Sequence, residues 1–399
     1  MRKILTIAFV AILVAYGCFC LYAARAVQQA ASKPWPAGLG TLASMPDHFP
    51  TQSENEAART LTRLATPLGI PFQRTAHVAP PYGDAAAAIG DYLGAERTSG
   101  EQTIADPPAA VTTFLAAHPS EIAAIRQHLL SDAPIAWSRD IAADQPPIPN
   151  LLGHMTIAKL FAASALVRAH QNDAGAWDDL HAAWNLSRSL HEQPDLITQL
   201  IALAMARVVN SVAWKMPSPA PQWLMQMDAV DHTHLLLRSM QYEKWFLWTH
   251  GSGNKPEEKA RMARIVEGIL WPFVRLTLAD MIDHDRETAL QLAAVTECGF
   301  DATAFYKRRL EGMARWNKPG RIMSEIEVSN LAAMWKRTFR YRVEREATRN
   351  ALARSASPSR CSDGTWSFDG TTLRFSREIP KSTMQESVMP LALKLNPRK

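Results

Sequence analysis

The sequence predicts a mainly α-helical protein with an N-terminal transmembrane helix, an irregular stack of antiparallel helical hairpins and a small C-terminal β-hairpin element. Three observations lead to this fold class. Residues 4–24 carry no charge, apolar side chains recur at helical spacing through much of the chain, and Asp369-Gly370 separates two short β-prone runs. Hydrophobic residues make up 47% and charged residues 20% of the chain, which is typical of a folded protein.

Residues 4–24 form an apolar run of 21 residues, and Arg2 and Lys3 precede it. About 20 apolar helical residues span the hydrocarbon core of a bilayer. The positive pair favours a cytoplasmic N-terminus. We therefore expect residues 1–26 to be a single-pass membrane anchor, with the body on the periplasmic or extracellular side.

A cleaved signal peptide is the alternative to an anchor, because Ala24-Arg25-Ala26 has the small-x-small spacing of a cleavage site. The apolar run exceeds the roughly 7 to 15 residues usual in a signal peptide, which favours a retained anchor. A lipoprotein signal needs a small residue two positions before its cysteine, whereas Tyr16 stands two positions before Cys18.

Proline and glycine divide the rest of the chain into four segments. Residues 27–50 contain four prolines and two glycines without a helical or strand period, so we expect a tether. An Ala-rich helical block over residues 51–150 ends at a proline-rich break. The main helical domain covers residues 151–356, and a small β tail covers residues 357–399.

Three consecutive helices are expected at the start of the main domain, over residues 151–170, 174–191 and 194–215. The third is apolar nearly all round, so a second membrane span is conceivable there. Gln199, Arg207 and Asn210 would make such a span costly, which favours a helix buried at the centre of a bundle.

The first two of these helices resemble one tetratricopeptide-type hairpin between Leu160 and Arg188. Large and small residues fall where that repeat packs its helices, and no second copy follows at the repeat's period. The residues at these packing positions are Leu160, Ala163, Ser164, Val167, Ala176, Leu180 and Ala183. The whole arrangement is similar to uncharacterised envelope proteins of bacteria, a resemblance that implies no activity.

In the tail, residues 365–368 and 371–375 flank Asp369-Gly370, which favours a type I′ hairpin turn. Residues 389–395 are expected to add a third strand, which a lone hairpin would need for stability.

Cys298 and Cys361 are the two cysteines outside the apolar run. In an oxidising compartment they could form a disulfide, and two free buried thiols are the alternative. The chain has no CxxC motif and no Cys/His cluster with zinc spacing, so the sequence gives no support for a structural metal site.

A basic helix face is expected near the end of the main domain, because residues 307–360 contain 14 basic and 5 acidic residues. Such a face could meet acidic lipid headgroups, an anionic envelope polymer or an acidic partner protein. The alternative is an ordinary solvated face of an amphipathic helix. The residues are Lys336, Arg337, Arg340, Arg342, Arg345 and Arg349.

Asp280, Asp283, His284 and Glu287 fall on one face of an expected helix, where they could hold a divalent metal or act in acid/base chemistry. The Glu-x-x-His motif of di-metal bundles is absent, and a solvated acidic face is the alternative. Ser252 lacks the glycine and strand that a hydrolase nucleophile elbow needs before its serine.

The sequence therefore favours a membrane-anchored, exterior-facing protein that acts by binding a protein or a polyanion, without catalysis and without a cofactor. Helical stacks offer concave surfaces for partner proteins. An envelope hydrolase or metal-dependent enzyme that uses the Asp280 to Glu287 face is the alternative. Nucleic acid is not expected as a partner, because the body would lie outside the cytoplasm.

Overall fold

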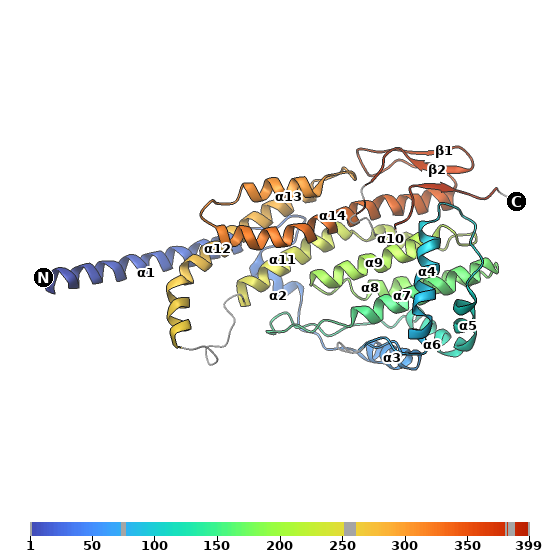
Figure 1. Cartoon of the computed structure of the whole chain (residues 1–399), viewed down its shortest axis with the longest axis horizontal. Coiled ribbons are helices and arrows are strands. Elements are labelled where there is room, and N and C mark those ends of the chain that lie inside the picture. Colours follow the sequence, from blue (N-terminus) through green and yellow to red (C-terminus); the bar gives the residue numbers. More distant parts are fainter. Residues whose placement is uncertain (1, 73–76, 251–260, 380, 382–387, 398–399) are drawn as a thin grey trace. The chain divides into compact units, whose positions relative to one another are not determined.

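A computed structural model describes residues 2–72, 77–250, 261–379, 381 and 388–397 (Figure 1). The chain is mainly helical and ends in a small antiparallel sheet, as predicted. It divides into two compact units. Unit 1 contains residues 1–48, 237–294 and 302–332, and unit 2 contains residues 49–236, 295–301 and 333–399. These units do not follow the predicted domain boundaries, because segments distant in sequence join the same unit.

Unit 1 is built around the N-terminal helix α1 (Arg2–Ser32), which packs against α12 (Arg261–Ala293). The rings of Phe19 and Phe273 meet edge to face with their centroids 5.0 Å apart. At the end of α1, Val27, Ala30 and Ala31 are buried. The other short elements that lie wholly in this unit are η1 (Leu42–Ser44), α2 (Met45–His48) and α13 (Ala302–Glu311).

The tether predicted for residues 27–50 is wrong. Helix α1 continues to Ser32, and the apolar residues between the prolines, among them Trp35, Leu39, Leu42 and Met45, are buried. Gly40 has a φ of +71°, and its carbonyl accepts a hydrogen bond from the Trp35 amide at 2.7 Å. Glycine adopts this left-handed conformation at little cost, so the prolines and glycines here form a compact turn.

Unit 2 has its core where α7 (Leu151–His170), α8 (Ala176–Arg188) and α9 (Leu196–Ala213) pack against one another. Large rings such as Phe161 and Trp184 are fully buried there. The surrounding helices are α3 (Glu56–Ala65), η2 (Thr66–Leu68), α4 (Tyr82–Thr98), α5 (Ala109–Ala117), α6 (Pro119–Leu130) and α10 (Leu224–Ala229).

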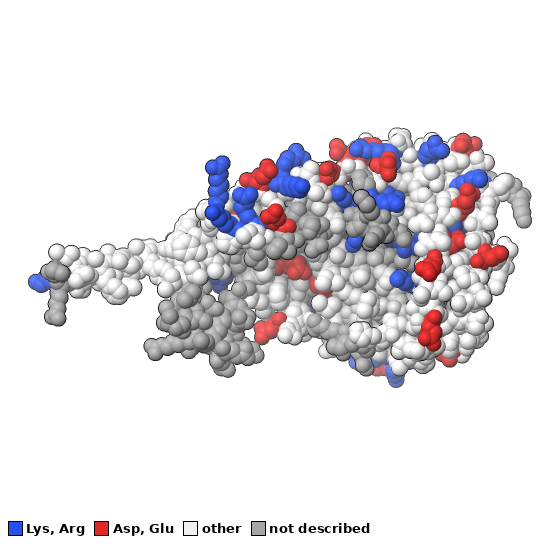
Figure 2. Space-filling view, in the orientation of Figure 1, with Lys and Arg blue, Asp and Glu red and all other residues white. Residues whose placement is uncertain are grey.

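Among the described residues, α1, α7 and α9 are long and apolar enough to cross a membrane. No residue in the apolar window of α1 is buried, whereas 72% of the window is buried within the protein in α7 and in α9. A buried central helix is therefore the better interpretation of α9. Figure 2 shows the first part of α1 as a white surface with basic residues at its N-terminal end.

Two long helices, α11 (His232–His250) and α14 (Lys318–Ala353), contribute residues to both units. Within unit 2, α14 is joined to α9 by a buried ion pair. The Arg207 guanidinium donates to both carboxylate oxygens of Glu344, at 2.8 and 3.0 Å, and Arg340 donates to Glu344 at 3.0 Å. Arg340 also donates to the carbonyls of Ile379 and Met389, which fixes the C-terminal segment to α14.

The C-terminal sheet has the strand order β1 (Trp366–Phe368), β2 (Thr372–Phe375), β3 (Ala392–Lys394), and both pairings are antiparallel. The predicted hairpin and third strand are confirmed. The type I′ turn is wrong, because Gly370 alone among the loop residues has a positive φ. The Asp369 carboxylate instead accepts the amides of Thr371 and Thr372 at 2.9 and 2.6 Å, which shapes a longer loop.

We predict that Glu344→Gln strongly destabilises unit 2. The substitution leaves Arg207 and Arg340 buried without a carboxylate, a type of change that costs about 3–5 kcal/mol. Urea denaturation of the full chain in detergent, followed by helical circular dichroism, measures the loss. Glu56→Gln is the matched control, because Glu56 is 66% exposed in its pairs with Arg59 and Arg63 and should cost less than about 1 kcal/mol. Equal losses for the two variants would contradict the prediction.

Candidate functional site

The residues of the predicted basic face do not form a solvated surface. Arg340 and Arg345 are buried, and both are bonded within unit 2. Lys336, Arg337, Arg342 and Arg349 are half-buried. The solvated-face alternative is therefore wrong for these six residues, because none of them is fully exposed.

Part of this face lines a cavity of about 330 Å³ that lies wholly in unit 2. One wall is residues 227–233, which lead into α11, and a second is α14. Arg360, from the segment after α14, also lines the cavity. The α14 wall repeats every three or four residues, which places its members on one helix face. They are Thr338, Tyr341, Arg342, Arg345, Glu346 and Arg349.

Three of the four arginines in this cavity have no carboxylate partner among the described residues. Arg345 is paired, since it donates to Asp228 at 2.8 Å and to Asn210 at 2.9 Å. The Arg342 guanidinium donates to the Thr233 hydroxyl at 3.2 Å. The guanidinium groups of Arg349 and Arg360 have no hydrogen-bond or ion-pair partner within the described part of the chain. We call Arg342, Arg349 and Arg360 the arginine cluster.

Apart from Asp228, which pairs with Arg345, the carboxylates of the cavity accept hydrogen bonds from uncharged donors. Glu346 accepts the Ser359 hydroxyl at 2.7 Å, the Arg360 amide at 2.7 Å and the Trp366 indole N–H at 2.9 Å. Asp231 caps the start of α11, where it accepts the Thr233 amide at 2.9 Å. These two carboxylates still act on Arg342 through their charge, but neither forms an ion pair with a guanidinium of the arginine cluster among the described residues.

Burial and repulsion both act on the cluster. Burial lowers the pKa of the Arg342 guanidinium, and the nearby positive charge of Arg360 lowers it further, while Asp231 and Glu346 oppose the shift. Arginine remains charged in proteins even after such a shift. An anion in the cavity would relieve the repulsion between these guanidinium groups.

Two buried polar groups of the cavity also have no hydrogen-bond partner within the described residues: His232 Nε2 and the Tyr341 hydroxyl. Their rings meet edge to face with centroids 5.1 Å apart. Burial, together with the charge of Arg345, lowers the pKa of His232 to about 3, so this ring is neutral near pH 7. Both atoms have almost no solvent-accessible surface, so they lie in the wall of the cavity rather than in contact with its open space.

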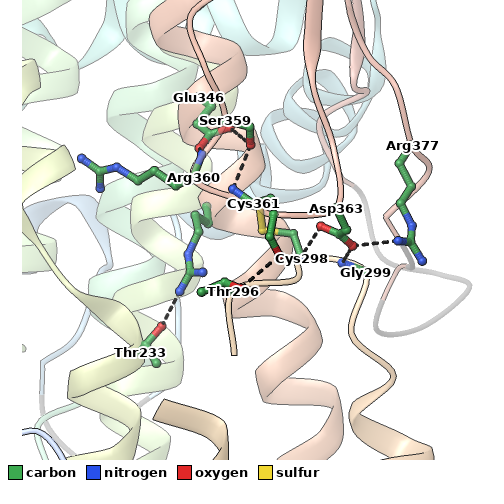
Figure 3. Close-up of a disulfide and its surroundings, with 12 residues drawn as sticks. Thr233, Thr296, Cys298, Gly299, Glu346, Ser359, Arg360, Cys361, Asp363 and Arg377 are labelled. Carbon is green, nitrogen blue, oxygen red and sulfur yellow. Dashed lines mark hydrogen bonds and ion pairs between the residues drawn. A yellow bond between two sulfur atoms is a disulfide. The ribbon is translucent and has the colours of Figure 1, made fainter. Parts of the chain in front are cut away.

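A disulfide holds the segment that supplies Arg360. Cys298 and Cys361 are bonded with their Cα atoms 5.4 Å apart, so the predicted bridge is confirmed and the two-thiol alternative is wrong (Figure 3). Asp363 accepts the amides of Cys298 and Gly299 at 2.9 and 2.8 Å. Figure 3 shows the Arg360 side chain extending away from the disulfide.

The candidate metal ligands on α12 are engaged separately. Asp283 pairs with Lys33 at 2.7 Å, Asp280 accepts from the Asn317 amide at 2.6 Å, and Glu287 pairs with Arg309 at 3.1 Å. Burial is the main cause that lowers the pKa of His284. No group of three or more potential ligands gathers among the described residues, and Ser252 lies outside them.

The sequence predicts Arg342 and Arg349 as members of this face but not Arg360, His232 or Tyr341. Tyr341 stands one helical turn before Arg345, so the period of α14 could have placed it on this face. Arg360 precedes Cys361, so a disulfide between Cys298 and Cys361 would have placed Arg360 near residue 298. His232 had no comparable signal, because it comes from a separate helix.

We predict that loss of the disulfide destabilises unit 2 and exposes the cavity. The bridge closes a loop with a sequence separation of 63, and removal of a native disulfide typically costs about 2–5 kcal/mol. Cys361→Ser should therefore lower the urea midpoint of the oxidised full chain. Dithiothreitol should lower the midpoint of the parent and leave that of Cys361→Ser unchanged. A parent midpoint that does not respond to reductant would refute this.

We also predict a pH dependence that originates at His232. The folded ring binds a proton only near pH 3, whereas an unfolded histidine binds one below about pH 6.5. The unfolded state therefore gains protons first, and stability falls as the pH decreases from 6.5 towards 3. His232→Gln should reduce this slope by up to about 1.4 kcal/mol per pH unit in urea titrations between pH 7.5 and 4.5. An identical slope in parent and variant would count against it.

No protein family model, no curated protein and no solved structure matches this chain.

Proposed function

We propose that the protein is a membrane-anchored, exterior-facing binding protein, without catalysis, whose cavity holds a carboxylate or phosphate group of an anionic partner. The observation that carries this proposal is the arginine cluster, whose guanidinium groups have no carboxylate partner among the described residues although they line a cavity. Hydrogen bonds between guanidinium groups and anions are among the strongest in proteins.

The size of the cavity limits what enters it. A volume of about 330 Å³ lies at the lower end of the roughly 300–1,000 Å³ that small-ligand pockets occupy. One carboxylate or phosphate group with a few attached atoms fits this space. The partner therefore inserts an acidic side chain, a chain terminus or one polymer unit, and the rest of it lies outside the cavity.

Two observations support retention of α1 as the anchor. The helix runs without interruption from Arg2 to Ser32, so the small-x-small sequence of a signal peptide lies within a helix. Ala23, Val27 and Ala30 at its end are buried in unit 1, and cleavage after Ala26 would remove part of that packing. The disulfide supports a body in an oxidising compartment, since such bonds are rare in the cytosol.

We predict that the full chain in detergent binds citrate, inorganic phosphate or polyphosphate, and that Arg349→Gln with Arg360→Gln weakens this binding. Each lost charge-assisted hydrogen bond is worth about 1.5–3 kcal/mol, or roughly tenfold or more in affinity. Isothermal titration calorimetry measures the change. Binding should also weaken as ionic strength rises, because salt screens these charges.

Arg374→Gln is the matched control, since Arg374 is an exposed arginine of β2 outside the cavity and has no ion pair among the described residues. It should bind the same anions as the parent. The proposed function would fall if none of the three anions bound, or if the double variant and the control bound equally well.

A further inference from the structure

We propose that a second segment of unit 1, the part of α12 from Gly268 to Arg275, inserts its apolar side into the outer leaflet beside α1. This inference rests on the proposed anchoring of α1 and adds a lipid contact that the apolar run does not include. Four large apolar residues of this segment are exposed: Ile269 (58%), Leu270 (49%), Phe273 (53%) and Val274 (54%). We call them the α12 patch.

The contact between α12 and α1 sets the depth of this patch. Phe273 meets Phe19, and the Tyr16 hydroxyl donates to the carbonyl of Gly268. Both α1 residues lie inside the uncharged run of residues 4–24. At 1.5 Å per residue, Phe19 lies about 8 Å and Tyr16 about 12 Å before the end of that run. A segment of α12 in contact with them therefore reaches below the membrane surface if α1 spans it.

The depth agrees with that of helices that lie in the bilayer interface, whose apolar faces sink about 5–10 Å into the lipid. The chemistry next to the patch is also that of an interface. The Arg275 guanidinium lies 5.4 Å from the centroid of the Trp271 ring. Tryptophan is enriched at the headgroup level, and a long arginine side chain can extend its charge to water while its stem stays in apolar surroundings.

The geometry of α12 suits a helix that enters and leaves the interface. Pro272 lies within the helix and interrupts its backbone hydrogen bonds, and Figure 1 shows α12 bent along its length. The segment that follows is anchored in unit 1, since the Asn317 amide donates to the Thr277 carbonyl and to Asp280. The bend therefore joins a lipid-facing part to a part that packs on protein.

A lipid surface is favoured over a protein partner because the patch is continuous with the surface of α1. Leu21 and Tyr22, near the outer end of the apolar run, are exposed by 64% and 63%. A water-soluble partner at the patch would have to cover residues that adjoin the membrane-spanning surface. Lipid covers both surfaces without an additional interface.

The test measures the depth of spin labels attached to the full chain in vesicles of phosphatidylcholine and phosphatidylglycerol. The parent carries Cys18→Ser and Cys20→Ser. Its two remaining cysteines are joined in the disulfide, so the label reacts only with the cysteine that each variant introduces. Leu270→Cys and Phe273→Cys place labels in the patch. For these labels we expect accessibility to dissolved oxygen, which concentrates in lipid, to exceed accessibility to a water-soluble nickel complex.

Two further labels provide controls. Leu290→Cys lies on the same helix at a 41% exposed position beyond the patch, and its label should be more accessible to nickel than to oxygen. Leu13→Cys lies on α1 and tests the anchor itself. Circular dichroism checks that every variant keeps the parent's helix content.

The outcomes separate the two proposals. If the Leu13 label is exposed to water, the anchoring fails. If the Leu13 label is in lipid while the Leu270 and Phe273 labels match Leu290, the second lipid contact alone is overturned. Labels at 270 and 273 that both reagents fail to reach, with spin–spin broadening between molecules, would mean that a second copy of the chain covers the patch, and would also overturn it.

Discussion

The fold of unit 2 depends on one buried carboxylate, that of Glu344. It neutralises Arg207 from α9 and Arg340 from its own helix. Both arginines are buried, so bulk water cannot solvate their charges in its place. A buried ion pair contributes little net stability, but an arrangement that left one member alone would be costly. The pair therefore selects the register of α14 on α9. Arg340 transmits that register to the C-terminal segment through the carbonyls of Ile379 and Met389.

The same register creates the cavity. Once Glu344 faces α9, the neighbouring helix face presents Arg342, Arg345 and Arg349 towards residues 227–233. Asp228 neutralises Arg345, and the remaining acidic groups serve as caps and loop supports. The guanidinium groups of the arginine cluster are thus left without an ion-pair partner among the described residues of unit 2. A folded protein tolerates this positive charge where a ligand supplies the missing anion, as the proposed function requires.

In unit 1 one helix, α1, combines an exposed apolar part long enough to cross a membrane with an end that is buried in the protein core. The first part of α1 is exposed and apolar, while its end packs with the turn that follows and with α12. Because the helix is continuous, unit 1 has no flexible connection to its anchor. If α1 spans a membrane as proposed, a body attached in this way lies close to the bilayer, and lipid is then the proposed cover for the exposed apolar residues of α12.

Local chemistry allowed the sequence to determine the apolar N-terminal helix, the succession of helices and the β-hairpin with its third strand, since each depends on residues at fixed spacing, whereas the pairing of Cys298 and Cys361 stayed open until the fold brought them together. Tertiary structure decided the rest. Trp35 and Leu42 became core residues of unit 1, and Asp369 bonded its own loop amides in place of a type I′ turn. The candidate site combines His232, one face of α14 and Arg360. The disulfide holds only the segment that supplies Arg360. Periodicity assigns each side chain to a face of its own helix, but packing and buried charge determine what that face meets.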